Sequence, residues 1–227
     1  MFQVLQMDAK KIAAERAVEY VQHGMTVGLG TGTTAYWAIL KLGQKIREGL
    51  RINAVATSIG TEKLANENNI PIVPFSKIDS IDLAIDGADE VDAQKNLIKG
   101  GGGALTREKI IAYNSKKFIV VVDESKLVEQ LGKFPLPVEV LPFGAELTVK
   151  HISLMGAEAK VRQEANGNYI TDNGNLIVDC RFGSIDNPAS LNAMLKTIPG
   201  LVETGIFLNT RVSVVVVGFK TGDVKEL

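Results

Sequence analysis

The segment at residues 99–110 reads KGGGGALTREKI and carries the groups most suited to chemistry in this chain of 227 residues. Four consecutive glycines leave successive backbone N–H groups uncovered, and such groups form nests that bind anions. Lys99 adds a full positive charge before the glycines, and Glu108 falls near the start of the helix predicted to follow them. A carboxylate held beside such donors in a closed cleft can act as a base at neutral pH. The alternative is that Glu108 is an ordinary acidic residue at a helix N-terminus and has no catalytic role.

A second glycine-rich segment, GLGTGTTA at residues 28–35, follows a predicted strand and opens a predicted helix. Glycines at such a junction let backbone N–H groups approach an anion, and Thr31, Thr33 and Thr34 add hydroxyl donors. The segment is therefore a candidate phosphate-binding loop. A dinucleotide site would need an acidic residue near the end of the next strand, which ends instead in the uncharged pair TS. A glycine turn that serves only close packing is the other alternative.

The third motif is DGADE at residues 86–90, directly after the apolar run IDLAI. Asp86 and Asp89 can hydrogen-bond sugar hydroxyls or hold a divalent cation, and a simple Asp-Gly turn at a strand end is the alternative. An octahedral oxygen site would need histidine or more clustered carboxylates than this motif supplies. This motif can hold a metal ion but does not require one.

Composition argues against several other classes of function. Lys plus Arg number 25 and Asp plus Glu 26, without a basic run, so we expect no nucleic-acid or membrane-surface partner. The longest apolar run, VSVVVVGF, is too short to span a bilayer, and the first residues lack the features of a signal peptide. Cys180 is the only cysteine, and His23 and His151 are far apart in the sequence, which argues against disulfides and zinc sites. A cytoplasmic location is expected.

The elements that must position these motifs alternate between helix and strand over roughly the first 125 residues. Continuous apolar strands separated by amphipathic helices predict a doubly wound, Rossmann-like α/β domain with a parallel sheet covered on both faces. Ligands of such sheets bind beyond the carboxyl ends of the strands. Four predicted strands end in polar loops at that edge: GTGTTA, TSIGTEK, DGADE and DESK.

From about residue 131 the pattern changes, and the proline-rich segment GKFPLPVEVLP marks a boundary. The elements that follow are predicted in the order βαββαβ, which is typical of a small ferredoxin-like α+β domain. The last apolar run, RVSVVVVGF, is predicted to return to the first sheet. We therefore expect a discontinuous catalytic domain at residues 1–130 and 207–227, and a small domain at residues 131–206.

The motifs together favour one kind of reaction. A base, a lysine, an N–H nest, a pair of carboxylates and a second anion-binding loop all follow strands of one predicted sheet. These groups suit removal of a proton next to the carbonyl group of a phosphorylated sugar, with the donors holding the resulting enediolate. One oxyanion donor is commonly worth about 2.7 to 4 kcal/mol, and general acid-base catalysis contributes about 10²- to 10⁴-fold.

These motifs also carry a family resemblance. GLGTGTTA, TEKLA, DGADE, KGGGGALTREKI and DESKLVEQLGKFPLPVEV, in this order and spacing, closely resemble the type A ribose-5-phosphate isomerases. The likeness covers nearly the whole chain and is strongest at residues 27–140. It implies interconversion of D-ribose 5-phosphate and D-ribulose 5-phosphate through an enediolate, as in the non-oxidative pentose phosphate pathway. It also implies a homodimer or homotetramer that uses neither a metal nor an organic cofactor.

The resemblance assigns roles to individual residues. The general base of the family falls on Glu108, and Lys10 lies where the family often has a lysine near the substrate. We expect the aspartates at the sugar end of the substrate, and the threonine loop with a lysine at the phosphate end. The family's substrate-binding positions fall on Thr31, Gly32, Thr33, Thr34, Asp86, Gly87, Ala88, Asp89, Lys99, Gly100, Gly101, Gly102 and Lys126.

Two rival functions fit the sequence less well. An amino-sugar-phosphate isomerase with deaminase activity would favour a histidine near the base, and neither histidine is placed for this. A regulator that senses sugar phosphates would need a DNA-binding helix pair and a basic face, and we expect neither.

Overall fold

The computed structural model describes residues 8–227, which divide into two compact units. Residues 8–87, 110–126 and 211–227 form the first, here called the α/β unit, and residues 88–109 and 127–210 form the second, the α+β unit. The predicted domains differ from these units mainly at residues 88–109, which were expected in the first domain. No helix among the described residues is both long enough and apolar enough to cross a membrane.

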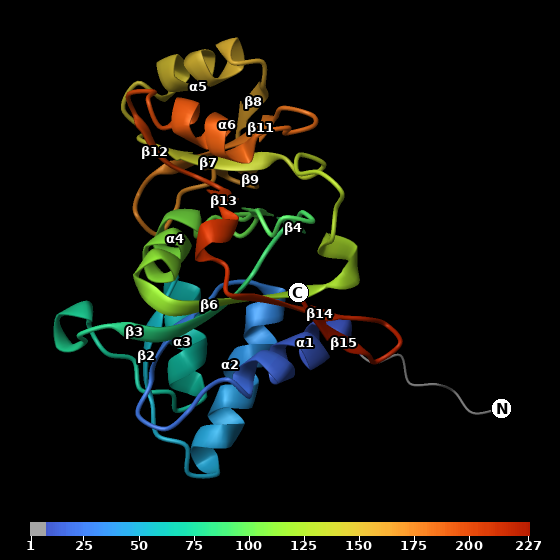
Figure 1. Cartoon of the computed structure of the whole chain (residues 1–227). Helices are drawn as coiled ribbons and strands as arrows, with labels where there is room; N and C mark the ends of the chain where they lie inside the picture. Colours follow the sequence, from blue (N-terminus) through green and yellow to red (C-terminus); the bar gives the residue numbers. More distant parts are fainter. Residues whose placement is uncertain (1–7) are drawn as a thin grey trace. The chain divides into compact units, whose positions relative to one another are not determined.

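A six-stranded sheet with the order β15-β14-β6-β3-β1-β2 forms the centre of the α/β unit. All neighbours run parallel except β15, which is antiparallel to β14. Figure 1 shows β6 beside β14, so the last apolar run returns to the first sheet as predicted. The strands are β1 (Thr26–Leu29), β2 (Asn53–Ala56), β3 (Ile81–Gly87), β6 (Ser115–Asp123), β14 (Val214–Gly218) and β15 (Val224–Glu226).

Helices cover both faces of this sheet, as the continuous apolar strands predicted. Helices α1 (Ala9–Val18) and α2 (Thr33–Arg47) share a core with Val27 and Leu29 of β1. On the opposite face, a Cβ at Gly28 would lie 2.4 Å from Cγ2 of Ile111, so glycine allows close approach of α4. The remaining helices of the unit are α3 (Ile59–Glu67) and the C-terminal half of α4 (Leu105–Asn114).

The order in which strands are added to the sheet reverses at β1. From β1 the chain goes first to β2 on one side and then to β3 on the other. In doubly wound sheets, such a switch point opens a crevice at the carboxyl ends of the strands, and ligands bind there. The loops after β1 and β3 are the two glycine- and aspartate-bearing motifs noted in the sequence.

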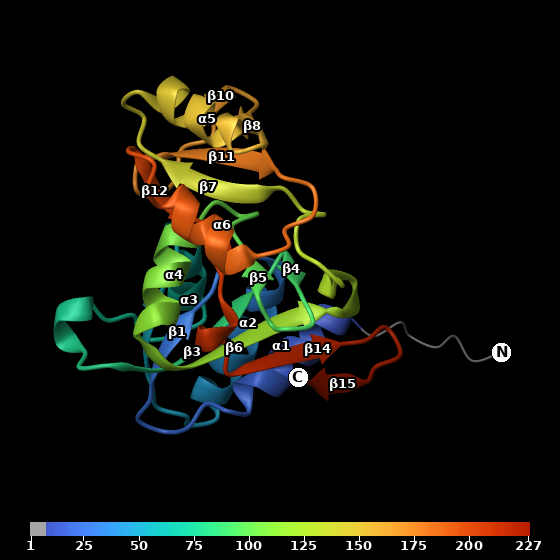
Figure 2. The same cartoon turned by 45° about the horizontal axis from the view of Figure 1, so that its top comes forward.

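A four-stranded antiparallel sheet with the order β12-β7-β11-β8 forms the main part of the α+β unit. Figure 2 shows β7 and β11 side by side at its middle. The chain order βαββαβ and this strand order confirm the predicted ferredoxin-like arrangement. The elements are β7 (Leu136–Val140), α5 (Ala145–Leu154), β8 (Glu158–Val161), β11 (Leu176–Arg181), α6 (Pro188–Leu195) and β12 (Leu201–Thr204).

Shorter elements complete the fold. A three-stranded sheet joins β4 (Glu90–Val91), β5 (Leu97–Ile98) and β13 (Ile206–Phe207) around the segment that leads into the glycine loop. The hairpin β9 (Gln163–Glu164) and β10 (Gly167–Asn168) extends the α+β unit, and η1 (Phe75–Lys77), η2 (Glu124–Lys126) and η3 (Asn209–Arg211) are 3₁₀ turns.

One predicted strand, PIVPF at residues 71–75, does not form. Only Ile72 makes an isolated bridge, to Ala54, and η1 follows. The physical reason is that Pro71 and Pro74 have no N–H group to donate to a neighbouring strand.

Candidate active site

The loop after β1 is shaped to leave a helix N-terminus open. Gly32 is the N-cap of α2 with φ 105°, a conformation that favours glycine, and no side chain caps this helix. By contrast, Asp8 caps α1 and Ser58 caps α3. The first N–H groups of an α-helix have no partner within the helix and carry partial positive charge. The start of α2 is therefore suited to an anion.

Asp86 fixes this loop from the neighbouring strand. Its carboxylate is buried at the end of β3, and Oδ1 accepts hydrogen bonds from the N–H of Thr31 at 3.1 Å and of Gly87 at 2.8 Å. A Cβ on Gly30 would lie 2.1 Å from the same Oδ1, so only glycine fits there. Asp86, which we expect at the sugar end of the substrate, thus also holds the loop that we expect at the phosphate end.

A lysine of α1 contacts the loop, and a second lysine lies near Asp123 at the end of β6. Nζ of Lys10 donates to Oγ1 of Thr33 at 3.0 Å, so the lysine for which the sequence offered least support contacts the loop. Burial raises the pKa of Asp123, but hydrogen bonds from Ser125 and the charges of Lys10 and Lys126 outweigh burial, and the net pKa is lowered. A cavity of about 450 Å³ is lined by Asp8, Ala9, Lys10, Asp123, Glu124, Ser125 and Lys220.

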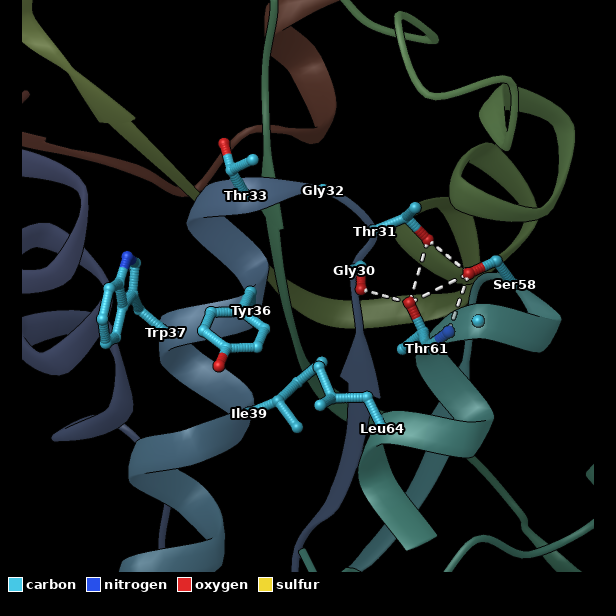
Figure 3. A pocket seen from close by; sticks show the side chains of 11 residues that line it. Gly30, Thr31, Gly32, Thr33, Tyr36, Trp37, Ile39, Ser58, Thr61 and Leu64 are labelled. Carbon is cyan, nitrogen blue, oxygen red and sulfur yellow. Dashed lines mark hydrogen bonds between the residues drawn. The ribbon is translucent and has the colours of Figure 1, made fainter. Parts of the chain in front are cut away.

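A second cavity of the α/β unit, of about 500 Å³, lies between the starts of α2 and α3. Figure 3 shows apolar side chains of both helices on one side and a group of hydroxyls on the other. Its lining residues are Gly30, Thr31, Gly32, Thr33, Tyr36, Trp37, Ile39, Ser58, Gly60, Thr61 and Leu64.

In the α+β unit, Lys99 and Glu108 form a buried ion pair. Nζ of Lys99 lies 3.2 Å from Oε2 of Glu108, and the two side chains are 3% and 4% exposed. Nζ of Lys99 also lies 5.4 Å from the centre of the Phe207 ring. A cation at this distance stabilises the ionised carboxylate, which is the form that accepts a proton. The predicted base and the predicted cation are therefore in contact.

The glycine loop between them is held by its own backbone groups. Gly100 has φ 101° and Gly103 has φ 76°, values that favour glycine, and a Cβ on Gly100 would lie 2.8 Å from Cδ2 of Leu105. The N–H of Gly101 donates to Oδ2 of Asp89 at 2.7 Å. Asp89 and the glycine loop therefore meet within this unit.

Sequence reasoning missed the side chains that hold the carbonyl groups of this loop. Nη1 of Arg162 donates to the carbonyl oxygens of Gly100 at 3.2 Å and of Gly101 at 3.0 Å. Asp179 orients Arg162 by accepting from Nε at 2.9 Å and from Nη2 at 2.6 Å. The hydroxyl of Tyr169 donates to the Gly102 carbonyl oxygen at 3.2 Å. These residues come from the strands and turns of the ferredoxin-like sheet, more than 50 positions away in the sequence.

A second lysine lies next to the base in the sequence. Burial lowers the pKa of Lys109 to about 8, although Glu203 opposes this shift from 2.9 Å. Nζ of Lys109 lies 4.8 Å from the centre of the Phe207 ring. Among residues 8–227, no group of three or more His, Cys, Asp or Glu side chains is arranged to hold a metal ion.

The structure distributes the predicted site residues over both units. The α/β unit holds residues 31–34, Asp86, Gly87 and Lys126, and the α+β unit holds Ala88, Asp89, Lys99, Gly100 to Gly102, and Glu108. Contacts join Thr31 with Asp86 in the α/β unit, and Lys99 with Glu108 and Gly101 with Asp89 in the α+β unit.

Comparisons with known proteins agree with the motifs. The model of the family described as ribose 5-phosphate isomerase A (phosphoriboisomerase A) matches residues 53–222. The ribose-5-phosphate isomerase A of Bacillus mycoides (strain KBAB4) is 51% identical over 221 residues, which are 97% of this chain and 99% of the relative.

Two solved structures extend the comparison to the fold. Ribose 5-phosphate isomerase A from Methanocaldococcus jannaschii is 47% identical with a TM-score of 0.91, covering 96% of this chain and 97% of that one. A D-ribose-5-phosphate isomerase in complex with phospho-erythronic acid is 45% identical with a TM-score of 0.93, covering 97% of this chain and 99% of that one. By sequence and by fold, this chain belongs to the ribose-5-phosphate isomerase A family.

Proposed function

We propose that this chain is an aldose-ketose isomerase that interconverts D-ribose 5-phosphate and D-ribulose 5-phosphate. The observation that carries the proposal is the buried contact of Lys99 with Glu108, 3.2 Å from Nζ to Oε2, at the two ends of the glycine loop. The related isomerase that binds phospho-erythronic acid supports it, because a carboxylate next to the carbon chain resembles the negative charge of an enediolate.

Glu108 is the general base of the proposed mechanism. It removes the proton from C2 of the open-chain aldose, and the electrons of that bond form the double bond between C1 and C2 while negative charge develops on O1. Lys99 and N–H groups of the glycine loop stabilise this charge, as oxyanion donors do in other enzymes. After a proton has passed from O2 to O1, Glu108 returns its proton to C1, and C2 becomes the ketone carbon.

The remaining predicted residues bind the substrate. The N–H groups at the start of α2 and the hydroxyls of Thr33 and Thr34 hold the phosphate, and Lys126 adds charge. Asp86 and Asp89 bind or polarise the sugar hydroxyls, and one of them assists ring opening. Residues 87–88 and 100–102 contribute backbone groups.

The test of this function is direct. Purified protein is incubated with ribose 5-phosphate, and formation of ribulose 5-phosphate is followed, with ammonia release from glucosamine 6-phosphate as the measure of the rival activity. We expect ketose from the pentose phosphate and no ammonia. Failure to convert ribose 5-phosphate would refute the proposal.

We further propose a cytoplasmic homodimer or homotetramer that needs no metal and binds no nucleic acid. The nearly balanced charge, 25 basic against 26 acidic residues without a basic run, supports the last point. Sedimentation analysis measures the oligomeric state, and turnover after treatment with a chelator measures dependence on a metal.

A further inference from the structure

We propose that Thr57, Ser58 and Thr61 are positioning residues for the loop at residues 30–34, and that Thr31 acts through them instead of donating to the phosphate. The inference rests on the proposed function, because it divides the work within the proposed phosphate-binding loop. It also gives a role to the TSIGTEK segment at residues 57–63.

Four hydroxyl groups meet in one cluster under the loop. Oγ1 of Thr31 lies 2.7 Å from Oγ1 of Thr57, 2.9 Å from Oγ of Ser58 and 3.1 Å from Oγ1 of Thr61. Figure 3 shows the hydroxyls of Thr31, Ser58 and Thr61 pointing toward one another. Thr57, Ser58 and Thr61 are 1%, 8% and 5% exposed, so little water reaches them.

Two members of the cluster hold the backbone where the loop begins. Oγ1 of Thr57 donates to the carbonyl oxygen of Leu29 at 2.9 Å, and Oγ1 of Thr61 donates to that of Gly30 at 2.9 Å. The backbone N–H of Thr57 also donates to the Leu29 carbonyl oxygen at 3.0 Å, so the Thr57 hydroxyl adds a second donor there, and the Thr61 hydroxyl extends the contact to Gly30 beyond the end of β2 at Ala56. The last peptide groups before the loop are thereby fixed in direction.

The number of hydroxyl protons in the cluster limits the hydrogen bonds that Thr31 can donate. Each hydroxyl has one proton, and a carbonyl oxygen only accepts, so Thr57 and Thr61 have used their protons on the backbone. Thr31 therefore donates its own proton within the cluster, to Oγ of Ser58 at 2.9 Å or to Oγ1 of Thr57 at 2.7 Å. Its backbone N–H already donates to Asp86 at 3.1 Å. Both donors of Thr31 are thus engaged inside the protein, whereas a phosphate oxygen needs a donor.

The next residues of the loop are arranged differently. Oγ1 of Thr33 accepts from Nζ of Lys10 at 3.0 Å, which leaves its own proton available for another acceptor. Figure 3 shows the Thr33 side chain directed away from the hydroxyl cluster. Gly32 and Thr33 begin a helix without a side-chain cap. We therefore assign the anion contacts to residues 32–34, and the shape of the loop to Thr31 and the cluster.

The experiment compares Thr61→Val, which removes the hydroxyl, with Thr61→Ser, which keeps it. We measure KM and kcat for ribose 5-phosphate and, independently of turnover, Kd for inorganic phosphate. Because phosphate binding contributes to the ground state and the transition state alike, Thr61→Val is expected to raise KM and Kd about tenfold with kcat changed less than about threefold. Thr61→Ser should stay within about twofold of the wild type in all three constants.

The matched control is Thr148→Val in α5 of the α+β unit. Thr148 is also a buried helical threonine whose hydroxyl donates to a carbonyl, that of Pro199 at 3.2 Å. We expect Thr148→Val to lower the melting temperature about as much as Thr61→Val does, but to leave KM and Kd unchanged. This result would show that general destabilisation does not cause the effect of Thr61→Val on phosphate binding. Unchanged phosphate affinity in a folded Thr61→Val protein would overturn the inference, and Thr57→Val provides the same comparison if Thr61→Val does not fold.

A double-mutant cycle tests the role given to Thr31. If Thr31 acts only through the cluster, Thr31→Val combined with Thr61→Val should bind phosphate no more than about twofold worse than the weaker single variant. Additive losses would mean that Thr31 contacts phosphate directly and would overturn the assignment. Failure of the wild type to isomerise ribose 5-phosphate would instead refute the proposed function, while the phosphate affinities would still test the positioning.

Discussion

Replacing Arg162 with methionine should disturb the proposed oxyanion site without touching the base. The guanidinium group holds the carbonyl oxygens of Gly100 and Gly101 through Nη1, and its other nitrogens bind Asp179. Methionine fills similar volume but has no donor. The Gly100 carbonyl still accepts from the N–H of Gly103 at 2.9 Å, and the N–H of Gly101 still donates to Asp89, so the peptide between Gly101 and Gly102 is loosened most. Since the N–H of Gly102 belongs to that peptide plane, a donor proposed to hold the enediolate moves as well.

The magnitude follows from these contacts. Hydrogen bonds to charged groups contribute about 1.5 to 3 kcal/mol each, but the side chains of Arg162 and Asp179 are 16% and 30% exposed, so water compensates part of the loss. We expect a net loss of about 2 to 4 kcal/mol in the free energy of unfolding, which lowers the melting temperature by about 5 to 15 °C. Misplacement of one oxyanion donor would lower kcat about 10²-fold.

The assay compares Arg162→Met with Arg162→Lys and with the control Arg181→Met. Lysine keeps the charge but lacks the planar fork that binds Asp179 and the carbonyls together, so it should restore kcat only in part. Arg181 is an exposed residue of the same sheet and should leave kcat within about twofold of the wild type. If Arg162→Met lowers the melting temperature but leaves kcat unchanged, the orientation of the glycine loop does not depend on Arg162 and the reasoning is refuted.

Two further predictions concern stability. The pKa of Lys109 is about 8 in the folded state and about 10.5 in the unfolded state, so the folded state binds fewer protons between these pH values. Between pH 7.5 and pH 10, the free energy of unfolding of the wild type should therefore rise relative to that of Lys109→Met by at most about 3 kcal/mol, as measured by denaturant unfolding. A difference between the two proteins that is the same at both pH values would contradict this. Gly30→Ala forces a Cβ to 2.6 Å from Cα of Asp86 and should lower both melting temperature and phosphate affinity. Its control, Gly60→Ala, lies in α3 with no contact closer than 3.9 Å and should stabilise by about 0.5 to 1 kcal/mol, so equal effects of the two variants would contradict the argument.

Local patterns were sufficient to predict the scaffold of the α/β unit. Apolar strands alternating with helices predicted the parallel sheet, and the position of each motif after a strand predicted that the loops after β1 and β3 would meet. The contact of Asp86 with Thr31 follows from that topology, because β1 and β3 are neighbours. The strand predicted at residues 71–75 was wrong, since prolines prevent pairing whatever the apolar pattern suggests.

The supports of the site could not be predicted in the same way. Arg162 and Tyr169 reach the glycine loop only because the ferredoxin-like sheet folds back onto residues 100–102, and no local pattern encodes that contact. The hydroxyls of Thr57 and Thr61 were visible as part of a polar loop. Their partners on β1 depend on the register of β2 beside β1, which local patterns do not specify.

The family resemblance predicted that Glu108 is the general base. The turnover of a Glu108→Gln variant is the most direct test of this role. We would measure kcat for Glu108→Gln, with Kd for phospho-erythronic acid to confirm that the fold and the binding site persist, and Glu146→Gln as control. Glu146 also lies in the first turn of a helix of the α+β unit but is exposed. The account predicts that Glu108→Gln lowers kcat by about 10² to 10⁴ while Glu146→Gln does not. A Glu108→Gln protein that turns over ribose 5-phosphate at nearly the wild-type rate would contradict it.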